Sequence, residues 1–305
     1  SFFRDALPFV DNLKFRYSVG QTGNDRIAPY QYLQLYDYAG SYVFNSSVND
    51  GIRASTMPNP NVTWEKSLKN DIGIEASLWN SLLGFEITLF KEHRTNILTA
   101  RRMSIPNTLG FTALPPENIG EAEVRGYEIA LTHRNRVFND FNYSLSANVS
   151  YSNSKIIFMD ETPESVPWRE QTGRPIGAQL VYKTDGTMYQ RDPDGGSNTI
   201  DPTQGAYHRS HRPGDLRIVN LTAEWGGATD NTINSDDMYR FNYTSTPRAV
   251  FGLNANCEYK GFDLSIFFQG QTGAYNYDGT FVSLGASSRQ NSYVARATDR
   301  WTVDN

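Results

Sequence analysis

The sequence predicts an all-β fold, and more specifically a transmembrane antiparallel β-barrel. Residues 141–151 and 251–259 alternate apolar and polar side chains without a break. Each apolar row begins and ends with an aromatic residue, as Phe141 and Tyr151 do, with mostly smaller residues between them. Successive side chains of a strand point to opposite faces, so each segment has one apolar and one polar face. Aromatic ends around an aliphatic middle are typical of a strand that faces lipid.

The polar faces help to distinguish a barrel from a water-soluble β-sandwich, whose strands also alternate. Solvent faces of a sandwich are usually rich in Lys, Glu and Thr, and its core faces show no preference for rings at strand ends. Small polar residues form the polar face of the first segment: Asn142, Ser144, Ser146, Asn148 and Ser150. This composition suits a water-filled lumen. A soluble β-rich glycan-binding or glycan-degrading module is the alternative from another class.

The same alternation predicts seven strands. In chain order they are residues 13–21, 70–79, 85–90, 126–132, 141–151, 250–259 and 262–269. The apolar rows that support the first four are Leu13, Phe15 and Tyr17; Ile72, Ile74 and Leu78; Phe85, Ile87 and Leu89; and Tyr127, Ile129 and Leu131. Leu145 and Val149, Leu253 and Ala255, and Leu264 and Ile266 do the same for the last three.

Connections between these strands alternate in length. Residues 80–83, 135–140 and the pair Lys260-Gly261 form short links, whereas 22–66, 94–122 and 155–247 form long ones. Outer-membrane barrels combine short periplasmic turns with long extracellular loops, so the sequence predicts the two kinds of connection at opposite ends.

The longest connection exceeds what a structureless loop usually spans, so we expect further strands near residues 179–183 and 216–221. On this spacing the chain would supply about a dozen of the ~22 strands of a large plugged barrel.

Composition excludes several other classes. No run of about 18 apolar residues occurs, which excludes membrane-spanning helices. A net charge of −5 without a basic block argues against binding of nucleic acid. Cys257 is the single cysteine, so the chain has no internal disulfide and no cysteine-cluster metal site. No catalytic constellation stands out, because paired carboxylates such as Glu75 and Glu86 belong to neighbouring strands of one hairpin, so we expect no enzyme.

Several motifs resemble SusC-like TonB-dependent outer-membrane transporters of the SusC/RagA family. In order along the chain they are LKFRYSVGQTGND at 13–25, NPNVTWEKS at 59–67, IPNTLGFT at 105–112, GEAEVRGYEIAL at 120–131, TGRPIGAQLVYKTDG at 172–186, PGDL at 213–216, TPRAVFGLNANCEYKGFDLSIFFQGQTG at 246–273 and DRWTVDN at 299–305. The resemblance covers nearly the whole chain. It identifies residues 1–305 as a partial barrel domain, the C-terminal half of the barrel, and we expect the plug, the N-terminal region and the last strand to lie outside it.

This resemblance implies uptake of a large nutrient, an oligosaccharide or a peptide, across the Gram-negative outer membrane. In the family a SusD-like surface lipoprotein covers the extracellular loops, and the TonB-ExbB-ExbD complex supplies energy through the N-terminal part. A siderophore or haem receptor shares the same architecture and is the alternative within this class.

The chain departs from the family after the PGDL element, where many members carry an Asp- and Gly-rich loop suggestive of calcium binding. Asp230, Asp236 and Asp237 are acidic here, but the EF-hand-like spacing is absent. We therefore favour a solvated acidic loop over a Ca2+ site and expect no cofactor. His208 and His211 are close in sequence but lack a third ligand.

Two sets of residues are candidates for contact with a solute. By strand parity, seven charged residues face the lumen, where cross-strand ion pairs are their ordinary role: Lys14, Arg16, Glu75, Glu86, Glu128, Glu258 and Asp263. Rings on the long connections are candidates for contact with ligand or lid: Tyr36, Tyr38, Tyr42, Trp168, Tyr182, Tyr189, Tyr207 and Trp225.

Overall fold

A computed structural model describes residues 7–54, 57–101, 114–138, 140–161, 164, 166–194, 199–202, 211–224 and 232–276. These residues form two compact units. The first unit comprises the described residues within Ser1–Pro163, Gln171–Gly177 and Thr246–Ala274, and the second comprises those within Glu164–Glu170, Ala178–Ser245 and Tyr275–Asn305. In the described part of the chain no helix is long and apolar enough to cross a membrane.

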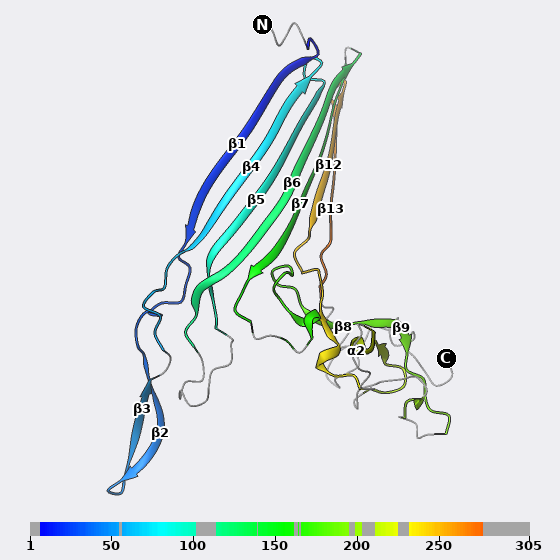
Figure 1. Cartoon of the computed structure of the whole chain (residues 1–305). Coiled ribbons are helices and arrows are strands. Elements are labelled where there is room, and N and C mark those ends of the chain that lie inside the picture. The colour runs from blue at the N-terminus through cyan, green and yellow to red at the C-terminus, as the bar shows by residue number, and fades with distance from the viewer. Residues whose placement is uncertain are drawn as a thin grey trace. The chain divides into compact units, whose positions relative to one another are not determined.

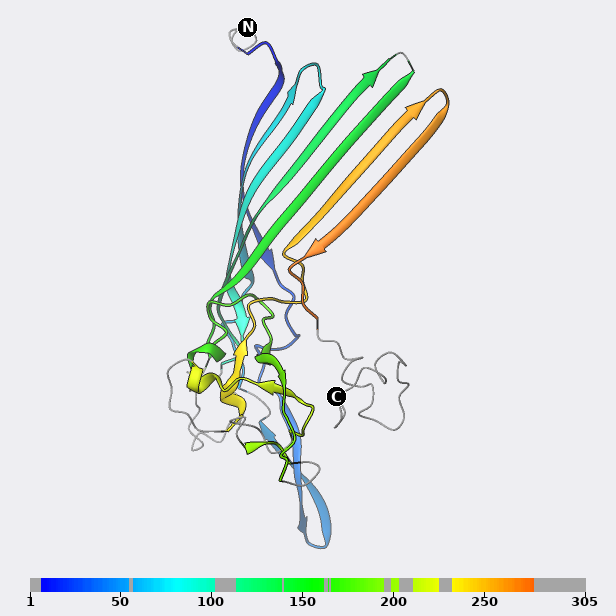
Figure 2. The same ribbon diagram turned by 90° about the vertical axis from the view of Figure 1, so that its right-hand side faces the viewer.

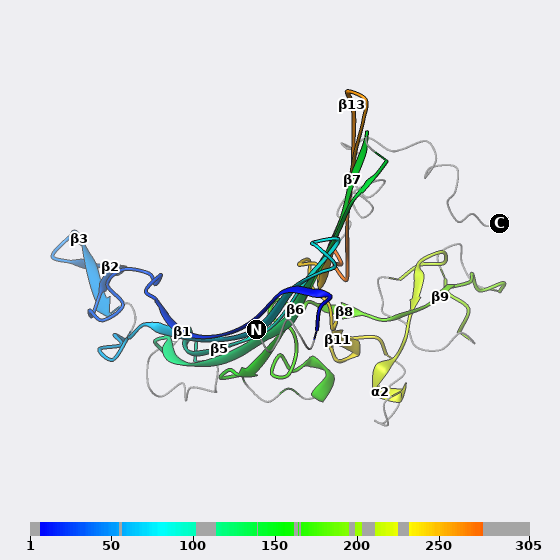
Figure 3. The ribbon, with the colours of Figure 1, turned by 90° about the horizontal axis from the view of Figure 1, so that it is seen from above.

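Seven long strands build the first unit as one antiparallel sheet (Figure 1). They are β1 (Val10–Asn24), β4 (Glu65–Leu78), β5 (Leu83–Thr99), β6 (Glu117–Val137), β7 (Phe141–Phe158), β12 (Ala249–Tyr259) and β13 (Phe262–Thr272), in the order β1-β4-β5-β6-β7-β12-β13. The sheet is strongly curved when seen along its strands (Figure 3). Within the described residues β1 and β13 are its edges, so the sheet is an arc of a barrel and not a closed one.

All seven predicted strands are confirmed, but β5, β6 and β7 extend well beyond their predicted ends. All three continue past the apolar alternation into charged segments, where Glu123 pairs with His93 of β5 and with Lys155 of β7. Because backbone hydrogen bonds and ion pairs hold these extensions, an apolar period could not reveal them.

The short connections all lie at one end of this sheet and the long ones at the other, as predicted (Figure 2). In the link between β12 and β13, Lys260 and Gly261 have φ of 47° and 84°, the backbone that a two-residue hairpin turn requires. In the link between β4 and β5, Asp11 accepts hydrogen bonds from the backbone N–H groups of Asn80 and Ser81, at 3.1 and 2.7 Å.

Two cross-strand rows bound the apolar face of the sheet. The loop-side row, nearer the long connections, comprises Tyr17, Ile72, Leu89, Tyr127 and Tyr151. The turn-side row comprises Val137, Phe141, Tyr259 and Phe262. Ten residues separate the rows along β7, about 34 Å of strand, which at a tilt of about 40° spans about 26 Å along the barrel axis. This height matches the roughly 25 Å apolar band of outer-membrane barrels.

The connection between β1 and β4 contains a hairpin that the sequence did not predict. It consists of β2 (Tyr36–Phe44) and β3 (Ser47–Ala54), which form a separate two-stranded sheet. A bulge between Tyr38 and Ser41 breaks the alternation, and aromatic residues stand on both faces. Neither face therefore has the continuous apolar row by which the other strands were found.

The second unit contains short elements: η2 (Pro167–Arg169), β8 (Leu180–Tyr182), β9 (Thr184–Met188), β10 (Leu216–Ile218), α2 (Leu221–Glu224), η4 (Ser235–Asp237) and β11 (Met238–Arg240). The strands expected near residues 179–183 and 216–221 are confirmed as β8 and β10, which pair with β11 and β9 in two small sheets. They do not join the long sheet. The estimate of about a dozen barrel strands is therefore wrong for the described residues, which contribute seven.

Side chains of the second unit pack around a small core. Tyr189, Leu221 and Ile233 are fully buried. Asp237 is buried with them, and its carboxylate accepts hydrogen bonds from the backbone N–H groups of Leu221 and Asn234, both at 2.9 Å. A buried carboxylate is stable here because it satisfies donors at the start of α2 and η4.

Candidate functional site: the polar face of the sheet and an aromatic pocket

The strand register places all seven charged candidates on one face of the sheet. Lys14 lies opposite Glu75, which lies opposite Glu86 on the next strand. Glu128 belongs to the same face because its neighbour two residues on, Ala130, is the partner of Glu86. Glu258 and Asp263 are partners of each other in β12 and β13.

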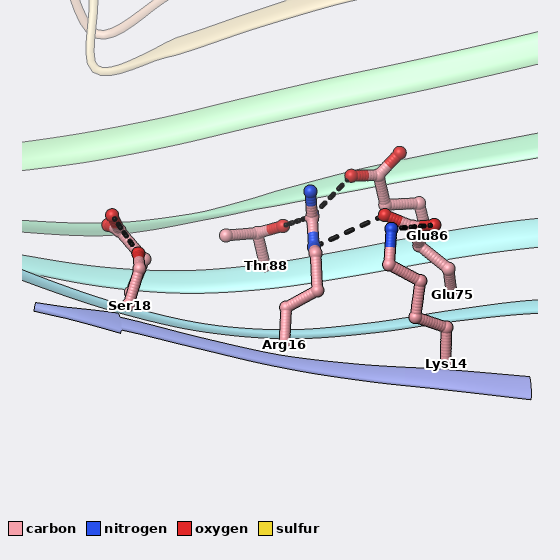
Figure 4. A network of polar contacts seen from close by, with 7 residues as sticks. Lys14, Arg16, Ser18, Glu75, Glu86 and Thr88 are labelled. Atoms are coloured by element: carbon pink, nitrogen blue, oxygen red, sulfur yellow. Dashed lines mark hydrogen bonds and ion pairs between the residues drawn. The ribbon is translucent and has the colours of Figure 1, made fainter.

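Arg16 bridges two carboxylates on neighbouring strands. Glu75 and Glu86 lie directly opposite each other, an arrangement of like charges that is unfavourable by itself. The Arg16 guanidinium contacts both: its Nε lies 3.2 Å from Glu75 Oε1, and its Nη2 lies 2.5 Å from Glu86 Oε1. Lys14 adds a 3.3 Å contact to Glu75, and Figure 4 shows this ladder across three strands.

Gly73 makes the reach of Arg16 possible. It is the direct partner of Arg16, and a Cβ at this position would lie 3.1 Å from both Nε and Nη2 of the guanidinium. The arginine therefore crosses flat over β4 to β5, where its Nη2 also donates to Thr88 Oγ1 at 3.0 Å. Arg16, Glu86 and Thr88 are among the residues that line an open groove of about 790 Å3.

The other charged candidates make weaker contacts with small polar residues. Ser150 donates to Glu128 and Asn142 donates to Glu258, both at 3.4 Å. Glu258 and Asp263 line a second groove of about 720 Å3 near the short turns, together with Arg134. The polar face thus carries both signs of charge.

The second unit holds an aromatic pocket of about 430 Å3 beside β8 and β11. Ring centroids of Phe241 and Tyr243 lie 5.1 and 4.8 Å from that of Tyr275. Tyr182, one of the predicted ring candidates, and Tyr239 line the same pocket. Three of these rings alternate along MYRFNY at 238–243, and this alternation is the signal in the sequence that marks the pocket.

Hydrogen bonds fix the walls of this pocket. The β11 residue Arg240 donates from Nε to the carbonyl of Arg169 and from Nη1 to that of Ala178, both at 3.1 Å. Phe241 continues the pairing by donating its backbone N–H to Gln179 at 2.9 Å. Such an apolar cavity with a few oriented polar groups is the usual form of a small-ligand site.

The other predicted rings have different environments. Tyr36, Tyr38 and Tyr42 are exposed on β2, with Tyr42 on the opposite face from the other two. Trp168 donates its Nε1–H to the carbonyl of Asp236 at 2.7 Å. Tyr189 is fully buried, and burial raises the pKa of its phenol, so its ring packs inside the unit and offers no surface to a ligand or lid.

Two of the acidic candidates for a metal site are engaged by protein groups. Asp236 Oδ1 accepts from Arg169 Nη1 at 3.0 Å, and Asp237 caps backbone donors as described above. Among the residues that the structure describes, no cluster of three or more potential metal ligands occurs. Tyr207, Trp225, Asp230 and His208 lie outside the described residues, whereas His211 stacks on Tyr189 at 5.4 Å.

Comparison with known proteins defines the family. Residues 5–182 match the family described as TonB dependent receptor-like, beta-barrel. The chain belongs to this family.

Curated relatives agree with this assignment. TonB-dependent receptor P3 of Formosa agariphila is 28% identical over the whole chain, and TonB-dependent receptor SusC of Bacteroides thetaiotaomicron is 25% identical over 91% of it. The chain spans about 30% of the length of the first relative and 26% of the second. These relatives are named receptors and not enzymes.

Solved structures show the same fold. The RagAB peptide importer in its "open-open" state covers 87% of this chain, with a TM-score of 0.62 and 19% identity. The chain covers 26% of that structure's chain. A second structure of the RagAB peptide transporter matches with a TM-score of 0.57 and 20% identity.

Proposed function

We propose that the full-length protein imports a large polar nutrient, an oligosaccharide or a peptide, across the Gram-negative outer membrane in a TonB-dependent manner. One observation carries this proposal: seven antiparallel strands have an apolar face bounded by two rows rich in aromatic residues and a polar face lined by charged residues. Lipid contact explains the first face, and a water-filled lumen explains the second. The family membership supports the same reading.

The charged ladder suits passage of a polar solute better than capture of a compact one. Arg16, Glu75 and Glu86 satisfy one another along the wall, and their side chains are 29–46% exposed. A wall of paired charges presents many weak hydrogen-bonding groups and no single deep site. We therefore place cargo selection in the second unit, at the aromatic pocket around Phe241 and Tyr275.

A SusD-like lipoprotein is the proposed partner at the end with the long connections. The β2–β3 hairpin lies within the connection from β1 to β4 and carries apolar side chains that remain exposed: 81% for Tyr38, 68% for Ile52 and 72% for Val43. Exposed apolar patches of this kind usually mark protein interaction sites. TonB-ExbB-ExbD would couple through the N-terminal part of the full-length protein.

The test is purification of the full-length protein from native membranes in mild detergent, followed by mass spectrometry of everything that co-purifies. A stoichiometric surface lipoprotein with bound oligosaccharide or peptide is expected. A lone barrel carrying a ferric chelate would instead show a siderophore or haem receptor, and recovery without detergent would refute a membrane protein altogether.

Uptake by cells that produce variants of the full-length protein tests the role of the pocket. Phe241→Ala is expected to lower uptake of the identified cargo, whereas Phe268→Ala, on the apolar face of the long sheet, should leave uptake unchanged. Equal uptake by both variants would remove the pocket from the proposal without affecting the transport assignment.

A further inference from the structure

Two rows of the long sheet lie just beyond the loop-side row, on the same outward apolar face. The first contains Lys91 and Arg125, which are direct cross-strand partners on β5 and β6. The next contains His93, Glu123 and Lys155, also joined by direct pairs. Side chains two positions apart on a strand share a face, so these residues point the same way as Tyr127 and Tyr151.

The stacked pair Tyr127 and Tyr151 marks where the apolar band ends. Their ring centroids lie 5.4 Å apart with an interplanar angle of 20°. Tyrosines concentrate at the level of the lipid head groups because the ring is apolar and the hydroxyl is polar. One row further along the strands is about 7 Å, or about 5 Å along the barrel axis, which is the depth of the head-group region.

Cations exceed carboxylates at this level. The Glu123 carboxylate lies 2.6 Å from Lys91 Nζ and 3.7 Å from Arg125 Nε, so one carboxylate forms ion pairs with two cations. The Lys91 and Arg125 side chains are nevertheless 57% and 67% exposed, whereas Glu123 is only 14% exposed. Glu121, further along β6, lies 3.9 Å from His93. With Lys155 included, the described residues of these two rows carry three permanent cations and one anion.

The opposite boundary of the apolar band differs. There the turn-side row leads directly into the short turns, and Lys260 lies over the ring of Tyr259 with its Nζ 5.3 Å from the ring centroid. The end with the long connections therefore has three cations, Lys91, Arg125 and Lys155, where the opposite boundary has Lys260. An anionic group at head-group level on that side would meet Lys and Arg side chains held in place by a shared carboxylate.

We infer that Lys91, Arg125 and Lys155 form a binding site on the outer wall for the phosphate groups of lipids in the leaflet at this end. Arginine binds phosphate with two parallel hydrogen bonds and lysine acts as a point charge. The inference rests on the proposed membrane span. A failure of that span would show separately, as loss of the folded barrel from membranes.

The experiment compares lipid binding by the full-length protein in detergent, measured by native mass spectrometry. The probe is a diphosphorylated glucosamine disaccharide lipid, and the comparison lipid is the same molecule without phosphates. Removal of one Lys or Arg near a charged membrane surface weakens binding about fivefold. The double variant K91Q/R125Q is therefore expected to bind the phosphorylated lipid about 30-fold more weakly.

Two further variants keep the test decisive. Glu123→Gln frees both cations and is expected to tighten binding, an effect that a purely structural ion pair would not produce. Lys260→Gln, a cation at the opposite boundary, should change nothing. Equal binding of the two lipids by the wild type, unchanged affinity in K91Q/R125Q, or no gain in E123Q would overturn the inference. Competition by inorganic phosphate at the lipid's own concentration would show an ion site and not a lipid site, which also overturns it.

Discussion

Placing an arginine on either face of β6 tests whether one face of the sheet contacts lipid and the other contacts water. Leu131 lies on the apolar face, four residues from Tyr127 of the loop-side row and six from Val137 of the turn-side row. At about 3.4 Å per residue and a tilt of about 40°, it sits about 10 and 16 Å from the two rows along the barrel axis, close to the middle of the band. Leu131→Arg should therefore cost about 2–4 kcal/mol, the value for a cation at mid-membrane.

The neighbouring position provides a matched control. Ala130 faces the other side of the sheet, opposite Glu86 and Asn148. An arginine there meets a carboxylate on the adjacent strand, a pair worth about 0.2–1 kcal/mol, and it stays in water if this face lines a lumen. Ala130→Arg should therefore cost little.

The assay is urea unfolding of the full-length protein reconstituted into lipid vesicles, followed by the shift in electrophoretic mobility between folded and unfolded barrel. The expected free-energy difference changes the folded-to-unfolded ratio by about 30-fold to 700-fold. Similar losses in both variants, or a larger loss in A130R, would refute the assignment of the two faces.

Three further predictions concern single contacts. Arg16→Met keeps the aliphatic stem but leaves the opposed carboxylates unbridged; at 40% exposure two screened contacts amount to about 1–2 kcal/mol of unfolding free energy. This loss should shrink in 1 M salt and on addition of Glu86→Gln, and a salt-independent loss would contradict it. Asp237→Ala leaves buried N–H donors unpaired and should cost about 1–3 kcal/mol, seen as faster proteolysis within residues 164–245 while the long sheet stays protected. Hydrogen bonds from Thr187 lower the pKa of Asp185, so the stability it provides is present above the ordinary carboxyl pKa of about 3.9 and is lost as pH falls through the lower folded value. Thr187→Val should shift that acid-side loss of protease resistance to higher pH, and an unchanged profile would exclude the contact.

The sequence predicted those parts of the fold in which one physical cause acts on every second residue. Lipid on one side and water on the other impose the period of two seen at 141–151, and all seven long strands carried it. Where neither face of a strand carries a continuous apolar row, the period disappears. The charged ends of β5, β6 and β7 and the β2–β3 hairpin, with its bulge and its rings on both faces, were missed for that reason.

The candidate sites were predictable to a lesser extent. Strand parity placed the seven charged residues on one face, because parity needs no knowledge of distant partners. The bridging role of Arg16 depends on Gly73 beside it and on the register of three strands, which parity alone does not give. The aromatic pocket brings residue 182 to residues 239–243 and 275, and the buried position of Tyr189 likewise depends on contacts across the second unit.

The unequal lengths of the connections also bear on how the sheet assembles. Pairing of β4 with β5, β6 with β7 and β12 with β13 closes loops of only a few residues, so each hairpin forms at small entropic cost. Pairing of β7 with β12 must close a loop of about 90 residues. The loss of chain entropy then costs about 3 kcal/mol more than closing a four-residue turn. The small sheets and buried core of the second unit shorten that flexible span once they have formed. A folded insertion therefore lowers the entropic cost of pairing the β12–β13 hairpin with β7.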